Sequence, residues 1–377
     1  MKITAAVVET ESGPFELTEV ALDDPRPDEM IVRMVATGMC HTDLSVRKGQ
    51  TPFPLPAVLG HEGAGVVEAV GARVGRFSPG DRVIISFASC GVCAGCSSGR
   101  PVYCGHWTEL NLLGGSRLDA SAPITRPSGP VHGHFFGQSS FASHALVHER
   151  SAIKAPDDVD LEVLAPLGCS VQTGVGAVLN VARPQPGSTL LVFGAGGVGL
   201  AALMGSKLTA AARVIAVDIN PSRLELAHEL GATHTVNSAE TDPFDAVLEL
   251  TGGVGADYAI ETTGRPAVLE TAIACMASGG TTVVVGAPPL GTTIPVDVPN
   301  LLGRGIRLVG TNQGDSDPSR FLPRLIDLHR RGSLPFDRLI HRFPFDRIND
   351  AAAAAMNGTV IKPVLVMPPV SEKGIHP

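Results

Sequence analysis

Four of the seven cysteines crowd into one short run, CGVCAGCSSGRPVYC, as Cys90, Cys93, Cys96 and Cys104. Two-residue gaps let neighbouring thiolates turn back onto one ion, and the glycines of the run permit the bends. Four thiolates close a tetrahedral Zn²⁺ site and leave no position for a substrate, which is typical of a structural zinc. An Fe–S cluster is the alternative, because four sulfur ligands alone do not exclude it.

Three further residues have the side chains of a catalytic zinc site: Cys40 in TGMCHTD, His61 in GHEGAG and Cys169 in PLGCSVQTG. Two cysteines and one histidine leave a fourth coordination position for water or substrate if the fold brings them together. Their spacing alone is a weak signal, since a lone cysteine is usually a small core residue. For Cys275, in AIACMASGG, we expect that core position, on a helix.

The glycine run GAGGVG at 194–199 could bind a dinucleotide. Gly194, Gly196 and Gly199 match G-x-G-x-x-G between the strand-like run TLLVF and an apolar helical segment, which is the context this motif requires. The glycines allow a tight turn, a close approach to the pyrophosphate and close packing of helix on strand. The helix N-terminus would receive the negative charge.

Asp218 ends the next strand-like run, VIAVD. Its carboxylate is expected to accept both hydroxyls of the adenosine ribose and to repel a 2′-phosphate, which favours NAD over NADP. The alternative for Asp218 is a helix cap before Pro221. Arg223 either flanks the ribose or is a solvated helix residue.

The sequence predicts two different kinds of domain to position these residues. Residues 1–150 consist of short apolar runs broken by Gly and Pro, which predict an irregular β domain. From about residue 170, strand-like and helical runs alternate, as in a doubly wound parallel sheet. From residue 314, two helical segments and the final run VIKPVLVM are expected to rejoin the first domain.

Length and composition agree with this division. A chain of 377 residues predicts two or three domains, and 44% hydrophobic against 18% charged residues excludes a disordered chain. The net charge of −8 argues against a nucleic-acid partner. We expect no transmembrane helix and no secretory signal, since no unbroken apolar stretch of about 20 residues occurs and the N-terminus lacks an apolar core. The expected location is therefore the cytoplasm.

Together, GHEGAG, the four-cysteine loop, LGCSVQTG and GAGGVG with Asp218 resemble the zinc-dependent medium-chain alcohol dehydrogenases. The order of the motifs matches over essentially the whole chain. The resemblance implies a GroES-like catalytic domain (1–170, with the structural zinc loop at 90–104), a Rossmann domain (171–313) and a C-terminal segment (314–377). It also implies an active site in the cleft between the domains and a homo-oligomer, either dimer or tetramer.

The resemblance also implies roles for single residues. Cys40, His61 and Cys169 would ligate the catalytic zinc, with Glu62 beside it and Asp43 bonded to the histidine. Thr42 would take the alcohol proton. Contacts to the cofactor are implied for Gly194, Gly196, Gly197, Val198, Gly199, Asp218, Arg223, Thr173, Val285, Ala287 and Lys362.

One position departs from the family pattern. Many members carry a proton-relay histidine five residues after the first cysteine ligand, where this chain has Ser45. His41 either replaces it or contacts the pyrophosphate, and both roles remain open.

FFGQSSFASHAL (135–146), SFASCGVCAGC (86–96), GDS (314–316) and GSLPFDRLI (332–340) are similar to the aryl (benzyl) alcohol dehydrogenase branch. We therefore expect an enzyme that oxidises a primary aromatic, allylic or terpene alcohol reversibly to the aldehyde with zinc and NAD. One alternative is a glutathione-dependent formaldehyde dehydrogenase or another zinc alcohol dehydrogenase on the same scaffold. Others are a non-catalytic NAD- and zinc-binding protein and a zinc-ribbon nucleic-acid module at 90–104.

Overall fold

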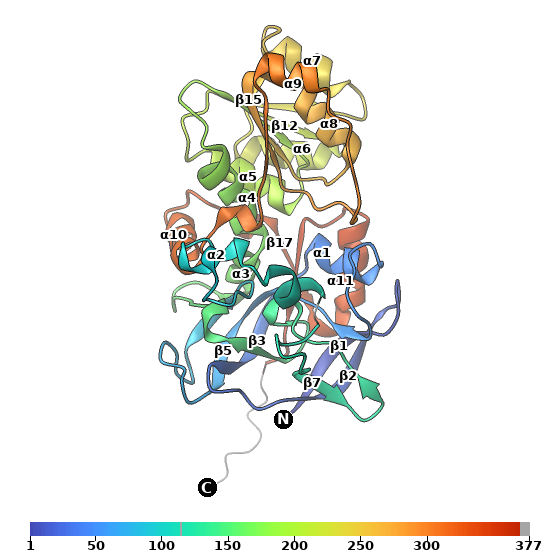
Figure 1. The fold of residues 1–377 in the computed structure, drawn as a ribbon, viewed down its shortest axis with the longest axis vertical. Helices are drawn as coiled ribbons and strands as arrows, with labels where there is room; N and C mark the ends of the chain where they lie inside the picture. The colour runs from blue at the N-terminus through green and yellow to red at the C-terminus, as the bar shows by residue number, and fades with distance from the viewer. Residues whose placement is uncertain (114, 370–377) are drawn as a thin grey trace. The chain divides into compact units, whose positions relative to one another are not determined.

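The computed structural model describes residues 1–113 and 115–369, and its internal contacts divide the chain into two units (Figure 1). Unit 1 comprises Met1–Ser89, His106–Gly168 and the described residues from Ile340 on. Unit 2 comprises Cys90–Gly105 and Cys169–Leu339.

Unit 1 is the predicted β-rich domain, built on two sheets. One has the order β10-β6-β5-β3-β18-β17, with β9 also paired to β3, and the other has the order β4-β1-β2-β7-β8. Its strands are β1 (Lys2–Val8), β2 (Phe15–Leu22), β3 (Glu29–Gly38), β4 (Ala57–Val58), β5 (Glu62–Val70), β6 (Arg82–Ile85), β7 (Ile124–Arg126), β8 (Gly129–Pro130), β9 (His144–His148), β10 (Ala152–Lys154), β17 (Ile340–Pro344) and β18 (Lys362–Val366). Its α-helices are α1 (His41–Arg47), α3 (Leu161–Leu164) and α11 (Ile348–Met356).

Unit 2 contains the predicted parallel sheet. Its order, β13-β12-β11-β14-β15-β16, is the doubly wound order 3-2-1-4-5-6. The strands are β11 (Thr189–Phe193), β12 (Arg213–Asp218), β13 (His234–Asn237), β14 (Ala256–Glu261), β15 (Met276–Val284) and β16 (Arg307–Gly310). The α-helices are α2 (Ala94–Ser97), α4 (Ser170–Gly176), α5 (Gly197–Ser206), α6 (Pro221–Leu230), α7 (Pro243–Leu250), α8 (Pro266–Ala274), α9 (Val298–Arg304) and α10 (Pro318–Arg330).

Local sequence explains where these helices begin and end. Pro221 is the first residue of α6, where its missing N–H is not needed, and the Asn220 side chain caps the helix by accepting from Ser222 N. Gly231 closes the helix with a φ of +141°, in the region that favours glycine.

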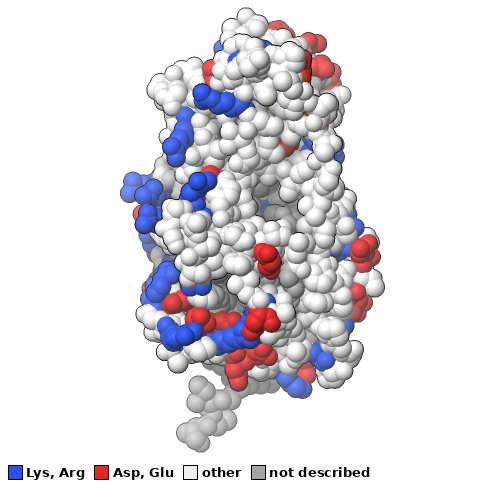
Figure 2. Space-filling model, in the orientation of Figure 1, with Lys and Arg blue, Asp and Glu red and all other residues white. Residues whose placement is uncertain are grey.

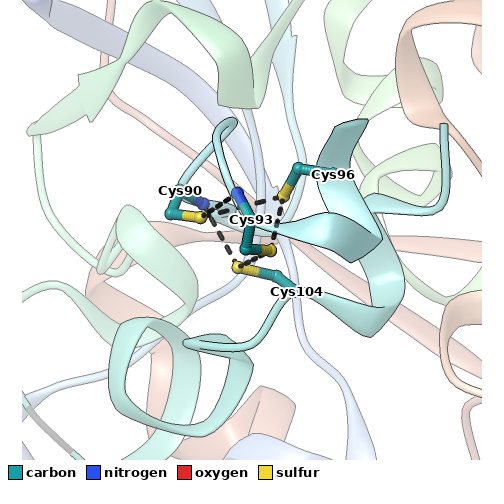
Figure 3. Close-up of side chains that lie close together, drawn as sticks. All are labelled: Cys90, Cys93, Cys96 and Cys104. Atoms are coloured by element: carbon teal, nitrogen blue, oxygen red, sulfur yellow. Dashed lines mark hydrogen bonds between the residues drawn. The ribbon is translucent and has the colours of Figure 1, made fainter. Parts of the chain in front are cut away.

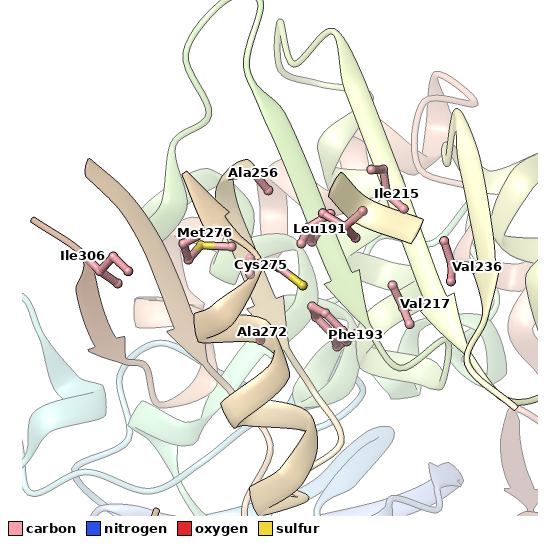
Figure 4. Packing of buried hydrophobic residues seen from close by; sticks show 12 residues of the cluster. Leu191, Phe193, Ile215, Val217, Val236, Ala256, Ala272, Cys275, Met276 and Ile306 are labelled. Atoms are coloured by element: carbon pink, nitrogen blue, oxygen red, sulfur yellow. The ribbon is translucent and has the colours of Figure 1, made fainter. Parts of the chain in front are cut away.

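The core of unit 2 lies where apolar side chains of neighbouring strands meet (Figure 4). Leu191 and Phe193 of β11 pack with Ile215 and Val217 of β12. Cys275 belongs to the same core, fully buried directly after α8, and burial raises the pKa of its thiol to about 12. The structure thus places Cys275 in the core, as the sequence predicted, but directly after the helix rather than on it.

The contact-based division differs from the predicted domain boundaries in two places. The loop at 90–104 belongs to unit 2, because Tyr103 OH donates to Asp315 Oδ1 and Asn312 Nδ2 donates to Val102 O. Residues 314–339 also belong to unit 2, whereas the chain from Ile340 joins unit 1, where β18 pairs with β3. The last eight residues of the predicted C-terminal segment lie outside the described residues.

Acidic and basic side chains lie intermixed on the face drawn in Figure 2. Within the described ranges, no single helix has the length and apolar character to cross a membrane. One bent pair of short helices, Leu161–Gly168 with Ser170–Ala182, reaches that length and composition only when the two are taken together.

Candidate active site and metal centres

Asp43 links the loop that carries Cys40 to the loop that carries His61. Its Oδ1 accepts from His61 Nδ1 (2.9 Å) and Gly60 N (3.1 Å), and its Oδ2 accepts from Cys40 N (2.8 Å). Both side chains of the Asp43–His61 pair are fully buried. Because the carboxylate accepts a hydrogen bond from Nδ1–H, the proton stays on Nδ1 and Nε2 is left as the ligand atom of the imidazole.

The residues around His61 Nε2 fit a metal ion. This nitrogen is buried and has no hydrogen-bond partner in the part of the chain that is described. The ligand atoms of Cys40, His61 and Cys169 all lie within 4.8 Å of one another. Gly168, the neighbour of Cys169 in the chain, is held in unit 1 because its carbonyl accepts from Ser86 Oγ (2.7 Å). Two sulfur atoms and one imidazole nitrogen are typical ligands of a catalytic zinc.

Burial lowers the pKa of His61, but the neighbouring Asp43 carboxylate outweighs it and raises the pKa to about 10. A metal ion that binds Nε2 must therefore displace a proton.

Glu62 lies beside this site and is paired with Lys362. Lys362 Nζ donates to both carboxylate oxygens of Glu62 (3.0 Å each) and to Met39 O (3.2 Å). The two side chains are at most 4% exposed. Burial raises the pKa of Glu62, although Lys362 opposes the shift. Gly38 pairs with Glu62 across β3 and β5, and a Cβ there would lie 2.0 Å from Glu62 Oε2, so only glycine leaves room for the carboxylate.

Aromatic rings cover the imidazole of His61. Phe136 stacks on it with ring centroids 4.5 Å apart, and Phe135 meets it edge-on at 5.4 Å. Trp107 packs against both Phe136 and Phe87. Phe136 has a φ of +50°, a conformation that bulky residues rarely adopt and that is typical of functional sites.

A buried glutamine holds the segments around the site in register. Gln138 Nε2 donates to His61 O (3.0 Å) and Ser86 O (3.3 Å), and its Oε1 accepts from Gly63 N (3.0 Å). Gln138 therefore joins the strand that follows His61 to Ser86, the residue bonded to Gly168. The sequence did not predict this role, because no motif marks a glutamine whose partners lie 52 to 77 residues away.

The four-cysteine loop has the geometry of a closed metal site (Figure 3). Neighbouring Sγ atoms lie 3.6, 3.9 and 4.0 Å apart in the pairs Cys93–Cys96, Cys93–Cys104 and Cys90–Cys96. Tetrahedral zinc with ligands at 2.3 Å needs sulfur atoms about 3.8 Å apart, and a disulfide needs about 2.0 Å. Hydrogen bonds from the backbone of Cys96 and Gly105 lower the pKa of Cys93 to about 6, which favours its thiolate.

The glycine loop joins β11 to α5 as predicted. Gly194 has a φ of +90°, and a Cβ on Gly199 would lie 1.7 Å from Gly194 O, so both positions require glycine. A Cβ on Gly196 would meet nothing within 4 Å, so the space over its backbone is open to a ligand. Asp218, at the end of β12, accepts from Ala195 N (2.6 Å) with Oδ2 and from Asn220 N (2.9 Å) with Oδ1. The carboxylate therefore lies against the glycine loop.

The other predicted cofactor residues of unit 2 lie in loops that follow strands of the same sheet or on neighbouring helices. Val285 N donates to Glu261 O (2.9 Å), and the backbone of Ala287 lies beside Gly264. Val198 is the second residue of α5, and its carbonyl contacts Gly174 of α4. Thr173 donates from its hydroxyl to Cys169 O (2.7 Å), and Arg223 is half-buried in the first turn of α6.

The predicted proton-transfer residues are in α1 of unit 1. The Thr42 hydroxyl oxygen lies 3.9 Å from Cys40 Sγ and is half-buried. His41 is exposed, and Ser45 is buried.

Comparison with known proteins agrees with this architecture. Residues 26–157 match the model of the alcohol dehydrogenase GroES-like domain, and residues 197–329 match that of the zinc-binding dehydrogenases. The chain is 47% identical to geraniol dehydrogenase of Castellaniella defragrans over 96% of its own length and 97% of that protein. The chain belongs to the zinc-binding alcohol dehydrogenase family.

Solved structures of other family members have the same fold. The structure of an alcohol dehydrogenase zinc-binding domain protein from Burkholderia ambifaria superposes with a TM-score of 0.94, at 50% identity, over 98% of this chain and 99% of that one. Benzyl alcohol dehydrogenase of Acinetobacter calcoaceticus also gives 0.94, at 43% identity, over 98% and 100%. The enzyme is thus a zinc alcohol dehydrogenase with a GroES-like domain and a dinucleotide-binding parallel sheet, as predicted.

Proposed function

We propose that this enzyme oxidises primary alcohols with an aromatic ring or an allylic double bond to aldehydes, reversibly, by hydride transfer to NAD. The observation that carries the proposal is the environment of His61. Its Nε2 is aimed at two cysteine thiols, and its ring is covered by Phe135 and Phe136. Flat apolar substrates suit aromatic surroundings of this kind. The relatives that act on geraniol and benzyl alcohol support the same substrate class.

The residues around His61 have separate roles in this proposal. Cys40, His61 and Cys169 would hold zinc, and the ion would supply a Lewis acid that makes an alcohol easier to deprotonate. Asp43 fixes the tautomer and direction of His61. Thr42, next to Asp43 in α1, would take the substrate proton while its own hydroxyl proton moves to the ribose hydroxyl of the cofactor. Phe135 and Phe136 exclude water, which strengthens the electrostatic interactions in the site.

Unit 2 would hold the cofactor. The helix N-terminus after Gly196 receives the pyrophosphate, and Asp218 accepts the ribose hydroxyls, which favours NAD. Thr173, Val198, Val285 and Ala287 are proposed to line the nicotinamide site. Lys362 is proposed to contact the pyrophosphate when the cofactor binds. In the structure, its ammonium group is bonded to Glu62.

We also infer a homo-oligomer that acts in the cytoplasm, where reducing conditions preserve cysteine thiolates as zinc ligands. β16 is an edge strand of the unit 2 sheet, and its Leu308 and Val309 are exposed. Leu302 of α9, nearby in the chain, is 82% exposed. Exposed apolar residues beside an unpaired edge favour pairing with a second copy. A monomer by sedimentation velocity at micromolar concentration would overturn this inference.

The activity is tested by NADH formation at 340 nm with benzyl alcohol, geraniol and ethanol. Turnover of the two larger alcohols that disappears in Cys40→Ser supports the proposal. Absence of turnover with every alcohol, in protein that contains two zinc ions per chain, would overturn the proposed substrate class.

A further inference from the structure

The segment Thr311–Ser316 follows β16 and packs against α4, the helix that begins directly after Cys169. Gln313, Gly314 and Asp315 have φ angles of +50°, +64° and +49°, so three consecutive residues are left-handed and only one is glycine. A Cβ on Gly314 would lie 2.7 Å from the carbonyl oxygens of Gln172 and Thr173. A strained conformation of this kind persists only where its surroundings hold it.

The Gln313 side chain points to the sulfur of Cys169. Gln313 is only 8% exposed, and its Nε2 lies 3.5 Å from Cys169 Sγ. Its Oε1 accepts from Gln172 Nε2 (3.4 Å), which fixes the direction of the amide, and lies 3.3 Å from Thr173 Oγ1. An N–H that donates to a thiolate withdraws charge from the sulfur and limits its movement, as partners of metal ligands do in general.

The other side of the same segment is bonded to the four-cysteine loop. Tyr103, which precedes Cys104, donates from its hydroxyl to Asp315 Oδ1 (2.6 Å). Thr311 Oγ1 donates to the same oxygen (2.6 Å), and Asn312 Nδ2 donates to Val102 O (3.2 Å). All of these residues belong to unit 2. Residues 311–315 therefore contact the four-cysteine loop and Cys169 at the same time.

We propose that the four-cysteine loop positions the Cys169 thiolate through this segment, with Tyr103 as the anchor and Gln313 as the donor to sulfur. Both are positioning residues, because each acts through Cys169. The inference rests on the proposed role of Cys169 as a ligand of the catalytic metal. It adds a second role to the loop: the metal at its four cysteines orders a ligand of the other metal.

Cobalt substitution tests the donor. The catalytic metal of the full-length enzyme is exchanged for Co²⁺ with zinc kept in the four-cysteine loop, and the thiolate-to-cobalt absorption and the transfer of cobalt to a chelator are measured. Gln313→Met removes the N–H. We expect the thiolate band to move to longer wavelength and the affinity for cobalt to fall about tenfold or more. Gln313→Asn tolerates the left-handed backbone but is too short to reach the sulfur, so it should behave like Gln313→Met.

A spectrum and release rate equal to those of the wild type in both variants, with zinc retained in the loop, would overturn the proposal. Tyr103→Phe then tests the anchor, with Tyr258→Phe as its control, since these are the two tyrosines of the chain. Tyr103→Phe should move the band in the same direction by less, and Tyr258→Phe should not move it. Identical behaviour of the two tyrosine variants would overturn the link from the loop. If the wild type shows no thiolate band at all, the proposed site itself fails, which distinguishes the two failures.

Discussion

Lys362 and Glu62, 300 residues apart in the chain, form a buried ion pair beside His61, the proposed zinc ligand. The pair joins β18, the last strand of unit 1, to the start of β5. Replacing a single partner leaves the other charge buried, which typically costs about 3–5 kcal/mol.

Lys362→Met should therefore lower the free energy of unfolding of the enzyme by about 3 kcal/mol or more, measured by urea denaturation. The double variant Glu62→Gln with Lys362→Met should recover much of this loss, since no charge then remains buried. If Lys362 serves mainly to bind pyrophosphate, the single variant would instead keep its stability and raise the KM for NAD.

His134 should make the enzyme sensitive to acid. Burial lowers the pKa of His134 to about 4, so between its ordinary value of 6.5 and pH 4 the unfolded chain binds a proton that the folded chain does not. The free energy of unfolding should therefore decrease as the pH is lowered from 6.5 to 4, by about 3 kcal/mol in total.

The His134→Asn variant removes the titratable imidazole, and asparagine tolerates the φ of +74° at this position. Its free energy of unfolding should fall less steeply than that of the wild type between pH 6.5 and 4. His341→Asn, at an exposed position, is the control. Parallel curves for wild type and His134→Asn would contradict the prediction.

Removal of zinc should separate two kinds of cysteine. In the zinc-loaded enzyme at pH 8, Cys275 should resist iodoacetamide, because burial keeps its thiol protonated. A chelator should expose Cys90, Cys93 and Cys96 to the reagent while Cys275 stays unmodified until the chain unfolds. Peptide mass spectrometry reads out each site, and early modification of Cys275 would show that the core of unit 2 opens without global unfolding.

The cofactor preference should depend on the charge of Asp218. Asp218→Asn keeps an acceptor for the neighbouring backbone N–H groups but removes the repulsion of a 2′-phosphate. We expect the ratio of kcat/KM for NADP to that for NAD to rise about tenfold, equivalent to about 1.4 kcal/mol. An unchanged ratio would place the selection of the cofactor elsewhere in unit 2.

The features predicted from sequence are mostly local ones. The four-cysteine loop and the glycine run between β11 and α5 each carry their ligands within 15 residues, so spacing reveals them. The sequence does not predict the roles of residues whose partners lie far away in the chain. Gln138 and Gln313 look like ordinary polar residues in sequence, and only tertiary structure shows that they donate to His61 O and Cys169 Sγ. The family resemblance predicts a pyrophosphate contact for Lys362, whereas only the structure reveals its bond to Glu62.

The carboxylate of Asp43 has a consequence for the order of events during maturation. It bonds the backbone of Cys40 and the ring of His61 through protein groups alone. Folding itself therefore positions these two proposed ligands relative to one another before a metal ion binds. Metal binding to the folded protein should therefore be a single step. Its observed rate should rise in proportion to the metal concentration, without a slow refolding phase.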